Sequence, residues 1–249
     1  MSRIYIFLVP LILLASAFDS LDMPVSPPNP RPKPPIIGQP PTEVRPEKPP
    51  LPEDPPPQPE EDDGPRLYDE EIPTQIDTII YVIDISGSMG GGRNSYTGLD
   101  GEPAYGSRIE RAKVELVKSI NSLSEDFKFN VVAYSCNLQR VFESMQQATP
   151  ENKARAIGWV YALHVGGGTG TGPAGALGLS EKSNQTLVIL SDGHPNCGAR
   201  GIDGHRQMIL DADTQHAVIH TFGISANGQF EAFLRSLSDA TGGVYHDID

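Results

Sequence analysis

The fold is decided by the stretch Thr78-Ile-Ile-Tyr-Val-Ile-Asp84, which runs directly into Ile85-Ser86-Gly87-Ser88-Met89. The residues before Asp84 are all β-formers and show no alternation of apolar and polar side chains. This composition is typical of a strand that is buried on both faces in a parallel sheet. The sequence therefore predicts a central strand whose carboxyl end opens into a loop with one acidic and two hydroxyl side chains.

Outward from this strand, further short apolar runs alternate with helical patterns. One helix is expected to begin at the capping box Ser107-x-x-Glu110 and a second at Thr149-Pro150, while a third ends at Gly242-Gly243. This alternation predicts an α/β fold with a doubly wound, mostly parallel sheet flanked by helices, over residues 74–249. The further strands are expected at residues 129–134, 138–142, 186–190, 217–222 and 244–245.

The first 17 residues have the features of an export signal. Arg3 precedes an apolar run from Ile4 to Leu14, and Ala15-Ser16-Ala17 fits the small-residue pattern of a cleavage site. The run is shorter than the roughly 20 apolar residues that span a bilayer. We therefore expect a signal peptide over residues 1–17 and a secreted or periplasmic protein with no transmembrane span after cleavage. An uncleaved signal would instead anchor the protein to the membrane.

Proline is concentrated between the predicted signal and the predicted domain. Of the 24 prolines, 18 lie between Pro24 and Pro65, among many acidic residues. Proline removes amide donors, and a segment with so few large apolar side chains cannot build a core. We expect residues 18–73 to form a disordered, acidic linker. A spacer is favoured over a docking peptide because the prolines are irregularly spaced, although the docking alternative stays open.

The charge balance excludes one class of partner. The chain has a formal net charge of −13, and residues 74–249 carry −6 of it. Domains that bind DNA or RNA, or that are held to anionic lipid, present basic patches. No nucleic-acid partner is expected.

Side chains with oxygen atoms are concentrated in three loops. The first follows the expected strand at residues 78–83, the second follows the one at residues 186–190, and the third is the glycine run over residues 166–172. In doubly wound sheets, ligands bind beyond the carboxyl ends of the strands. Hard oxygen ligands with few charges suit Mg²⁺, Mn²⁺ or Ca²⁺ rather than zinc. The sequence therefore predicts a metal site. Its predicted ligands are Asp84, Ser86, Ser88, Thr169 and Asp192.

These five positions closely resemble the metal-ion-dependent adhesion site of the von Willebrand factor type A domain family. That pattern is Asp-x-Ser-x-Ser, then a distant Thr, then a distant Asp. The phrases Gly167-Gly-Thr169-Gly-Thr171, Leu190-Ser-Asp-Gly193 and Thr241-Gly-Gly-Val-Tyr245 are similar to those of bacterial secreted members. The resemblance covers residues 74–249.

The resemblance implies that the two serines and Thr169 touch a bound Mg²⁺, or Mn²⁺ or Ca²⁺, while the two aspartates act directly or through water. It also implies that an acidic residue of a protein ligand completes the coordination of the metal. The loop over residues 90–106 is longer than in the simplest members, and we expect it to set partner choice or to shield the metal.

The resulting hypothesis is an adhesion-type module outside the cytoplasm that is not an enzyme. One alternative is a scaffold subunit of a multiprotein assembly that works with an ATPase. A metal-dependent hydrolase is disfavoured because no general base has a suitable spacing. A dinucleotide site at Gly170-Thr-Gly172-Pro-Ala-Gly175 is also disfavoured, because no clear strand leads into it.

The two cysteines and the histidines leave smaller questions. Cys136 and Cys197 follow the second and third parallel strands, on either side of the predicted site. In an exported protein they are candidates for a disulfide, with two free thiols as the alternative. His216 and His220 have a ligand-like spacing, but packing is expected of them, and His194 is a weak candidate neighbour of the metal.

Overall fold

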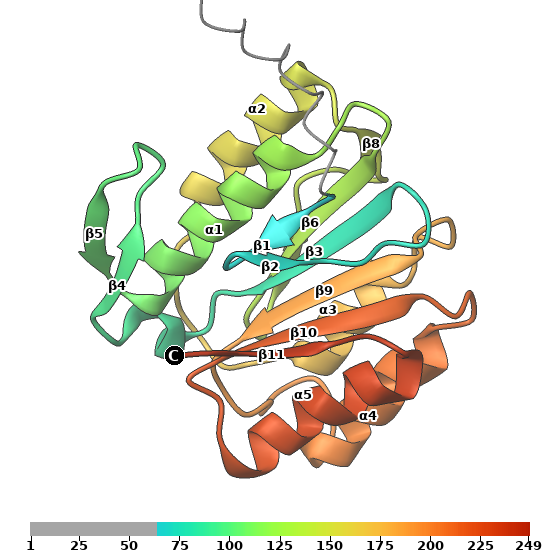
Figure 1. Cartoon of the computed structure of the whole chain (residues 1–249). Coiled ribbons are helices and arrows are strands. Elements are labelled where there is room, and N and C mark those ends of the chain that lie inside the picture. Colours follow the sequence, from blue (N-terminus) through green and yellow to red (C-terminus); the bar gives the residue numbers. More distant parts are fainter. Residues whose placement is uncertain (1–63) are drawn as a thin grey trace, which may run out of the picture. The chain divides into compact units, whose positions relative to one another are not determined.

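A computed structural model describes residues 64–249, so the predicted signal peptide and residues 18–63 of the predicted linker lie outside the described residues. Figure 1 shows a central sheet with helices on both faces. The strand order is β11-β10-β9-β3-β6-β7, and β8 also pairs with β6. The strands are β3 (Thr78–Asp84), β6 (Lys128–Tyr134), β7 (Leu138–Arg140), β8 (Gln146–Gln147), β9 (Thr186–Ser191), β10 (Val218–Ile224) and β11 (Tyr245–Ile248).

The sheet is mostly parallel, with β3 at its centre. β3 pairs in parallel with β6 and β9, and β10 pairs in parallel with β9 and β11. Only the short β7 and β8 run antiparallel to β6 within this sheet. Val82 lies opposite Val132 on one side and Ile189 on the other. The predicted doubly wound sheet is confirmed, and its carboxyl edge brings together the ends of β6, β3 and β9.

The side chains of β3 alternate between two hydrophobic cores. Ile79, Tyr81 and Ile83 belong to the core on one face, whereas Ile80 and Val82 belong to the core on the other. Every residue of β3 is buried, which explains the absence of a period of two in its sequence. The first face carries α1 (Arg108–Ser122) and α2 (Pro150–Tyr161), and the second carries α3 (Thr171–Gly178), α4 (Gly201–Ala212) and α5 (Gly228–Thr241).

The predicted helix ends are confirmed by local hydrogen bonds. At α1, the Ser107 amide donates to Glu110 Oε2 over 2.7 Å, as a capping box requires. At α2, the Thr149 hydroxyl accepts the Asn152 amide over 3.3 Å. α5 ends at Gly242, whose φ of 75° is the left-handed conformation that glycine adopts without strain.

A hairpin precedes the predicted domain. β1 (Arg66–Leu67) pairs with β2 (Glu70–Glu71), and Leu67 and Ile72 are buried in the same core as α1 and α2. The ring of Tyr68 stacks on Phe222 of β10, with centroids 6.1 Å apart. The packed region therefore begins before the predicted boundary at residue 74. The β1–β2 hairpin has few apolar side chains, and they lie among charged residues next to the proline-rich segment. For this reason the composition did not indicate that the hairpin is packed.

The long loop over residues 90–106 contains a second hairpin, in which β4 (Asn94–Thr97) pairs with β5 (Pro103–Gly106). A short 3-10 turn, η1 (Gly87–Gly90), comes between β3 and this hairpin. The hairpin lies beside α1, next to the carboxyl edge of the sheet (Figure 1). The amide of Arg108, the first residue of α1, donates to the Gly91 carbonyl over 3.0 Å, which closes the base of this segment.

Glycines allow α3 and α4 to pack closely. A Cβ added at Gly172 would lie 2.9 Å from the His205 Cα, and one at Gly175 would lie 2.8 Å from Ile209 Cγ1. Gly178, in contrast, faces the sheet, where a Cβ would lie 2.6 Å from Leu187 Cδ1. In α2, a Cβ at the exposed Gly158 would have no neighbour within 4 Å.

We predict opposite effects for the same substitution at two helical glycines. Gly172→Ala should lower the free energy of unfolding by about 1–3 kcal/mol, because α4 must move away from α3. Gly158→Ala should raise it by about 0.5–1 kcal/mol, because alanine favours the helix and nothing opposes its methyl group. Urea denaturation checks both, and an equal loss at both positions would contradict the packing argument.

Candidate metal centre

Asp84 is the innermost residue of the site, at the carboxyl end of β3. Its side chain is fully buried, and each carboxylate oxygen accepts a hydrogen bond from the protein. The Ser86 amide donates to Oδ1 over 2.7 Å, and the Ser191 hydroxyl at the end of β9 donates to Oδ2 over 2.5 Å. The turn after β3 and the neighbouring strand thus fix the carboxylate in place.

The two serines face each other across the η1 turn. The Met89 amide donates to the Ser86 carbonyl over 3.1 Å, and this turn places the Ser86 and Ser88 hydroxyl oxygens 3.1 Å apart. The Ser88 hydroxyl also donates to Asp192 Oδ1 over 2.6 Å. The loops after β3 and β9 therefore meet at Ser88, as the strand order requires.

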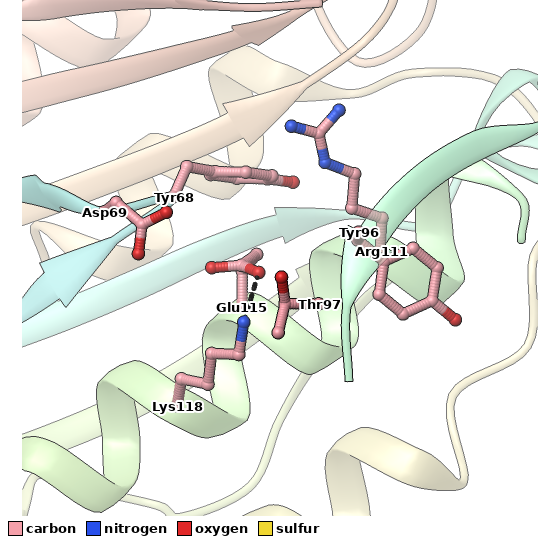
Figure 2. A pocket seen from close by; sticks show the side chains of 7 residues that line it. All are labelled: Tyr68, Asp69, Tyr96, Thr97, Arg111, Glu115 and Lys118. Carbon is pink, nitrogen blue, oxygen red and sulfur yellow. Dashed lines mark hydrogen bonds and ion pairs between the residues drawn. The ribbon is translucent and has the colours of Figure 1, made fainter. Parts of the chain in front are cut away.

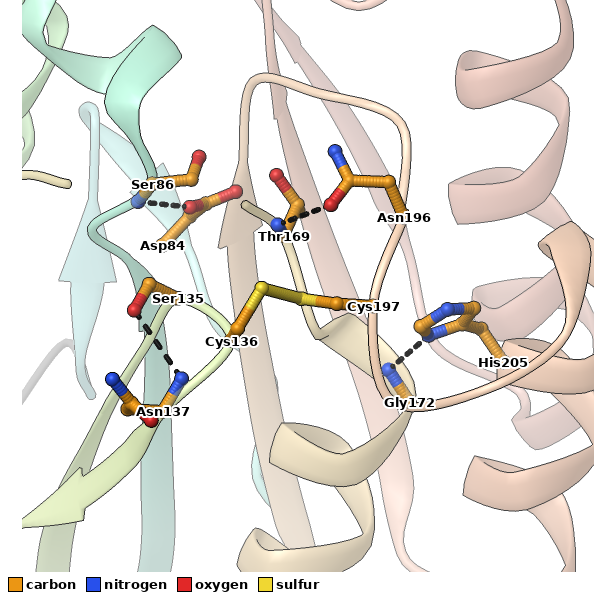
Figure 3. The surroundings of a disulfide bond; sticks show 10 residues. All are labelled: Asp84, Ser86, Ser135, Cys136, Asn137, Thr169, Gly172, Asn196, Cys197 and His205. Atoms are coloured by element: carbon orange, nitrogen blue, oxygen red, sulfur yellow. Dashed lines mark hydrogen bonds between the residues drawn. A yellow bond between two sulfur atoms is a disulfide. The ribbon is translucent and has the colours of Figure 1, made fainter. Parts of the chain in front are cut away.

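Thr169 is held by a pair of bonds to one residue. Its amide donates to Asn196 Oδ1 over 2.9 Å (Figure 3). The backbone amide of Asn196 donates back to the Thr169 carbonyl over 2.8 Å. A Cβ added at Gly193 would lie 3.3 Å from Ser88 Oγ and 3.9 Å from Thr169 Oγ1. Both hydroxyls therefore border the small space that the missing side chain of Gly193 leaves.

The oxygen spacing suits a small, hard cation. Ligands at about 2.1 Å from Mg²⁺ in octahedral geometry lie about 3.0 Å from each other. The separation of 3.1 Å between the two serine hydroxyls matches such an edge, and Thr169 borders the same space. Within residues 64–249 no group of three or more His, Cys, Asp and Glu side chains could hold a metal. The donor set that the sequence predicts is of another kind, with three hydroxyls and two carboxylates.

Burial makes the Asp84 carboxylate costly. The pKa of Asp84 is raised from 3.8 to about 6, because burial raises it more than the bonds from Ser191 and Ser86 lower it, and the charge of Asp192 adds to the rise. The same environment raises the pKa of Tyr134, through burial first and then the charge of Asp84. A buried negative charge next to a second carboxylate is an environment that a bound cation would relieve.

A disulfide joins Cys136 to Cys197 and packs against the loop that carries Thr169. A Cβ at Gly168 would lie 3.0 Å from Cys136 Sγ, and one at Gly170 would lie 3.6 Å from Cys197 Sγ. Figure 3 shows the bond between the loops after β6 and β9, below Asp84 and Thr169 in this view. Of the two states that the sequence left open, the structure has the bonded one.

Three residues at the site were not predicted from the sequence. Ser191 and Asn196 hold Asp84 and Thr169, and Arg108 donates to Asp192 Oδ2 over 3.1 Å. Ser191 directly precedes the predicted ligand Asp192, and Asn196 directly precedes Cys197. This adjacency is the one feature of the sequence that could have indicated their place at the site, and it is a weak one. Arg108 lies far along the chain from its partner, and only the tertiary fold connects them.

The other sequence candidates have structural roles. The ring of His220 accepts the Val244 amide at Nδ1 and contacts the Pro73 carbonyl at Nε2, so both nitrogens are engaged by backbone. The ring of His194 packs against Phe230, with centroids 5.6 Å apart. No strand leads into the glycines at the start of α3, so the dinucleotide pattern lacks its structural context.

A separate hollow of about 260 Å³ lies between the β1–β2 turn, β4 and α1 (Figure 2). Lys118 pairs with Glu115 across its floor over 2.9 Å, and the guanidinium of Arg111 lies 5.0 Å from the centroid of the Tyr68 ring. The hollow contains none of the predicted metal ligands. Its lining residues are Tyr68, Asp69, Tyr96, Thr97, Arg111, Glu115 and Lys118.

Comparisons with known proteins point to one fold. Mouse inter-alpha-trypsin inhibitor heavy chain 4 is 30% identical over 196 residues, which cover 72% of this chain and 19% of the mouse protein. This chain thus spans about a fifth of the length of that relative. No model of a protein family matches the sequence.

Two solved structures share the architecture. A von Willebrand factor type A protein from Catenulispora acidiphila has a TM-score of 0.55 and 21% identity, covering 70% of this chain and 39% of its own. The pilus adhesin SpaC of Lactobacillus rhamnosus GG, in its open conformation, has a TM-score of 0.54 and 14% identity, covering 71% and 28%. In the described part of this chain, no helix has the length and apolar character of a membrane span.

We predict that Asp84→Asn stabilises the metal-free protein. The raised pKa means that the charged carboxylate costs the fold up to about 3 kcal/mol above pH 6, a cost that vanishes as the pH falls from 6 to 3.8. Asparagine keeps an acceptor for the Ser86 amide and carries no charge. In EDTA, the free energy of unfolding should rise by about 1–3 kcal/mol at pH 7.5 and by less at pH 4.5.

The matched control is Asp126→Asn, at the exposed turn before β6, which should change the free energy by less than about 0.5 kcal/mol. Urea denaturation at the two pH values gives both numbers. A loss of stability at pH 7.5 on replacing Asp84 would show that its charge is not under strain.

We also predict that loss of the disulfide weakens both the fold and the site. Replacing both cysteines by serine opens a loop with a sequence separation of 61 residues, which should cost about 4 kcal/mol. The loop that carries Thr169 loses its packing partner, so affinity for Mn²⁺ should fall as well. Urea denaturation and Mn²⁺ titration measure the two effects, and unchanged Mn²⁺ affinity would separate the disulfide from the site.

Proposed function

The folded region of this chain is a von Willebrand factor type A domain, and we propose that it binds a protein partner through a divalent metal, with Mg²⁺ the first choice and Mn²⁺ or Ca²⁺ the alternatives. One observation carries the proposal. Two serine hydroxyls lie 3.1 Å apart beside Thr169, over two carboxylates that the protein already holds by hydrogen bonds. This is an interaction domain rather than an enzyme.

The chain's own residues divide into two roles in this proposal. Ser86, Ser88 and Thr169 would bind the metal directly through neutral oxygens. Asp84 and Asp192 would act through water, because both oxygens of each already accept hydrogen bonds from protein groups. Neutral ligands leave positive charge on the metal, which supplies the attraction for a carboxylate of the partner.

Exposed side chains around the site would form the rim of the interface. Val165 is 39% exposed and its Cγ2 would lie 3.1 Å from a Cβ at Gly90, next to the η1 turn. On the β4–β5 hairpin, Leu99 and Tyr105 are exposed. Aromatic side chains such as Tyr105 are enriched in the parts of protein interfaces that a partner covers.

The domain is proposed to work outside the cytoplasm. The signal sequence over residues 1–17 would direct export, and the acidic, proline-rich segment over residues 18–63 would act as a spacer. The disulfide at the site supports an oxidising compartment.

Calorimetric titration with Mg²⁺ and Mn²⁺ tests the metal site. We predict that Ser86→Ala weakens binding by at least about tenfold, because a direct ligand is lost. The matched control is Ser122→Ala, which should bind metal like the wild type. Ser122 is the last residue of α1, about 20 Å along the helix from Arg108 at the site. Absence of metal binding by the wild-type protein would overturn the proposal.

A pull-down from the native organism tests the partner. A partner that is retained with Mg²⁺, and is lost with EDTA or with Ser86→Ala, supports binding through the metal. A partner retained in EDTA, above all an ATPase, would favour the scaffold role instead.

A further inference from the structure

Arg108 lies where the helix does not favour it. It is the first residue of α1, and the partial positive charge of a helix N-terminus disfavours a cation there. Its side chain instead extends to the metal centre, where Nη1 donates to Asp192 Oδ2 over 3.1 Å and to the Ser88 carbonyl over 3.3 Å. The position of Arg108 is therefore explained by the site rather than by the helix.

The guanidinium is fixed and partly shielded from water. The side chain of Arg108 is 28% exposed, and that of Asp192 is fully buried. The side chain packs beside two glycines of the preceding loop, since a Cβ at Gly91 would lie 3.5 Å from Arg108 Nη1 and one at Gly92 would lie 3.4 Å from Cγ, both ordinary contact distances. Among the described residues, Arg108 Nε is buried without a hydrogen-bond partner. An ion pair in such a setting is screened less than one on the open surface.

Charge counting shows what this cation does. Asp84 and Asp192 together contribute −2, so a divalent metal alone would bring the centre to zero. With Arg108 the metal-free centre has −1 and the loaded centre has +1. A fixed positive charge next to Asp192 opposes a second cation, and the same charge attracts an anion that arrives at the loaded site.

We infer that Arg108 is a specificity-determining residue of this centre, which weakens metal binding and strengthens binding of a carboxylate to the loaded metal. The inference rests on the proposed function and adds to it a residue outside the predicted ligand set. It assigns to one guanidinium two effects of opposite sign.

The test separates these two effects. Mn²⁺ alone is titrated by calorimetry, and acetate is then titrated into the Mn²⁺-loaded protein while the water proton relaxation rate is followed. For Arg108→Gln, which keeps a hydrogen-bond donor and removes the charge, we predict Mn²⁺ binding about tenfold tighter and acetate binding severalfold weaker. Arg108→Lys should stay near the wild type in both measurements, because it restores the charge.

Arg111→Gln is the matched control, because Arg111 lies three residues further along α1 and contacts Tyr68 rather than the site. It should leave both affinities unchanged. Thermal unfolding in EDTA verifies that each variant is folded. If Arg108→Gln does not fold, the wild type is compared with Arg108→Lys alone. In that case, tighter Mn²⁺ binding by Arg108→Lys than by the wild type would contradict the charge argument.

The outcomes distinguish this inference from the proposed function. If the wild type binds Mn²⁺ and Arg108→Gln binds it equally or more weakly, Arg108 merely positions Asp192 and the inference is wrong, while the metal site stands. If the wild type does not bind Mn²⁺, the proposed function itself is wrong. Tighter Mn²⁺ binding with weaker acetate binding supports both.

Discussion

The burial of a carboxylate at the end of the central strand is the constraint on which the site depends. β3 is covered on both faces, so the side chain of its last residue, Asp84, is fully buried. The protein offsets this cost with the Ser86 amide and the Ser191 hydroxyl, which come from the turn after β3 and from the end of β9. Satisfying one buried charge therefore fixes the two loops that carry Ser86, Ser88 and Asp192.

The parts that sequence predicted are those governed by local rules. An unbroken run of β-formers reveals a strand buried on both faces, and the pattern Asp84-x-Ser86-x-Ser88 marks its carboxyl edge. The order β6-β3-β9 then brings Asp192 to the same edge, and the loop before α3 brings Thr169 beside it. Local rules were sufficient there because neighbouring parallel strands must end together.

The parts that were missed depend on contacts between distant segments. In the sequence, Leu67 and Ile72 are isolated apolar residues in a charged, proline-rich segment. Their role in the core is evident only in the fold, where they join the same cluster as the side chains of β10 and the neighbouring Tyr68 stacks on Phe222. Arg108 looks like an ordinary helix residue until Asp192 is placed beside it. A pattern read along one segment cannot reveal these roles, because each is set by a partner elsewhere in the chain.

Arg108 also resolves a conflict between long-range and local charge. Residues 74–249 carry a net charge of −6, which at a distance would repel the acidic partner that the proposed metal requires. Salt screens that repulsion beyond about 10 Å, whereas the proposed metal and the guanidinium would act within a few ångströms of an incoming carboxylate. A net acidic domain can therefore recognise an acidic residue, provided that the attraction is confined to the centre and that the partner docks closely enough to reach it.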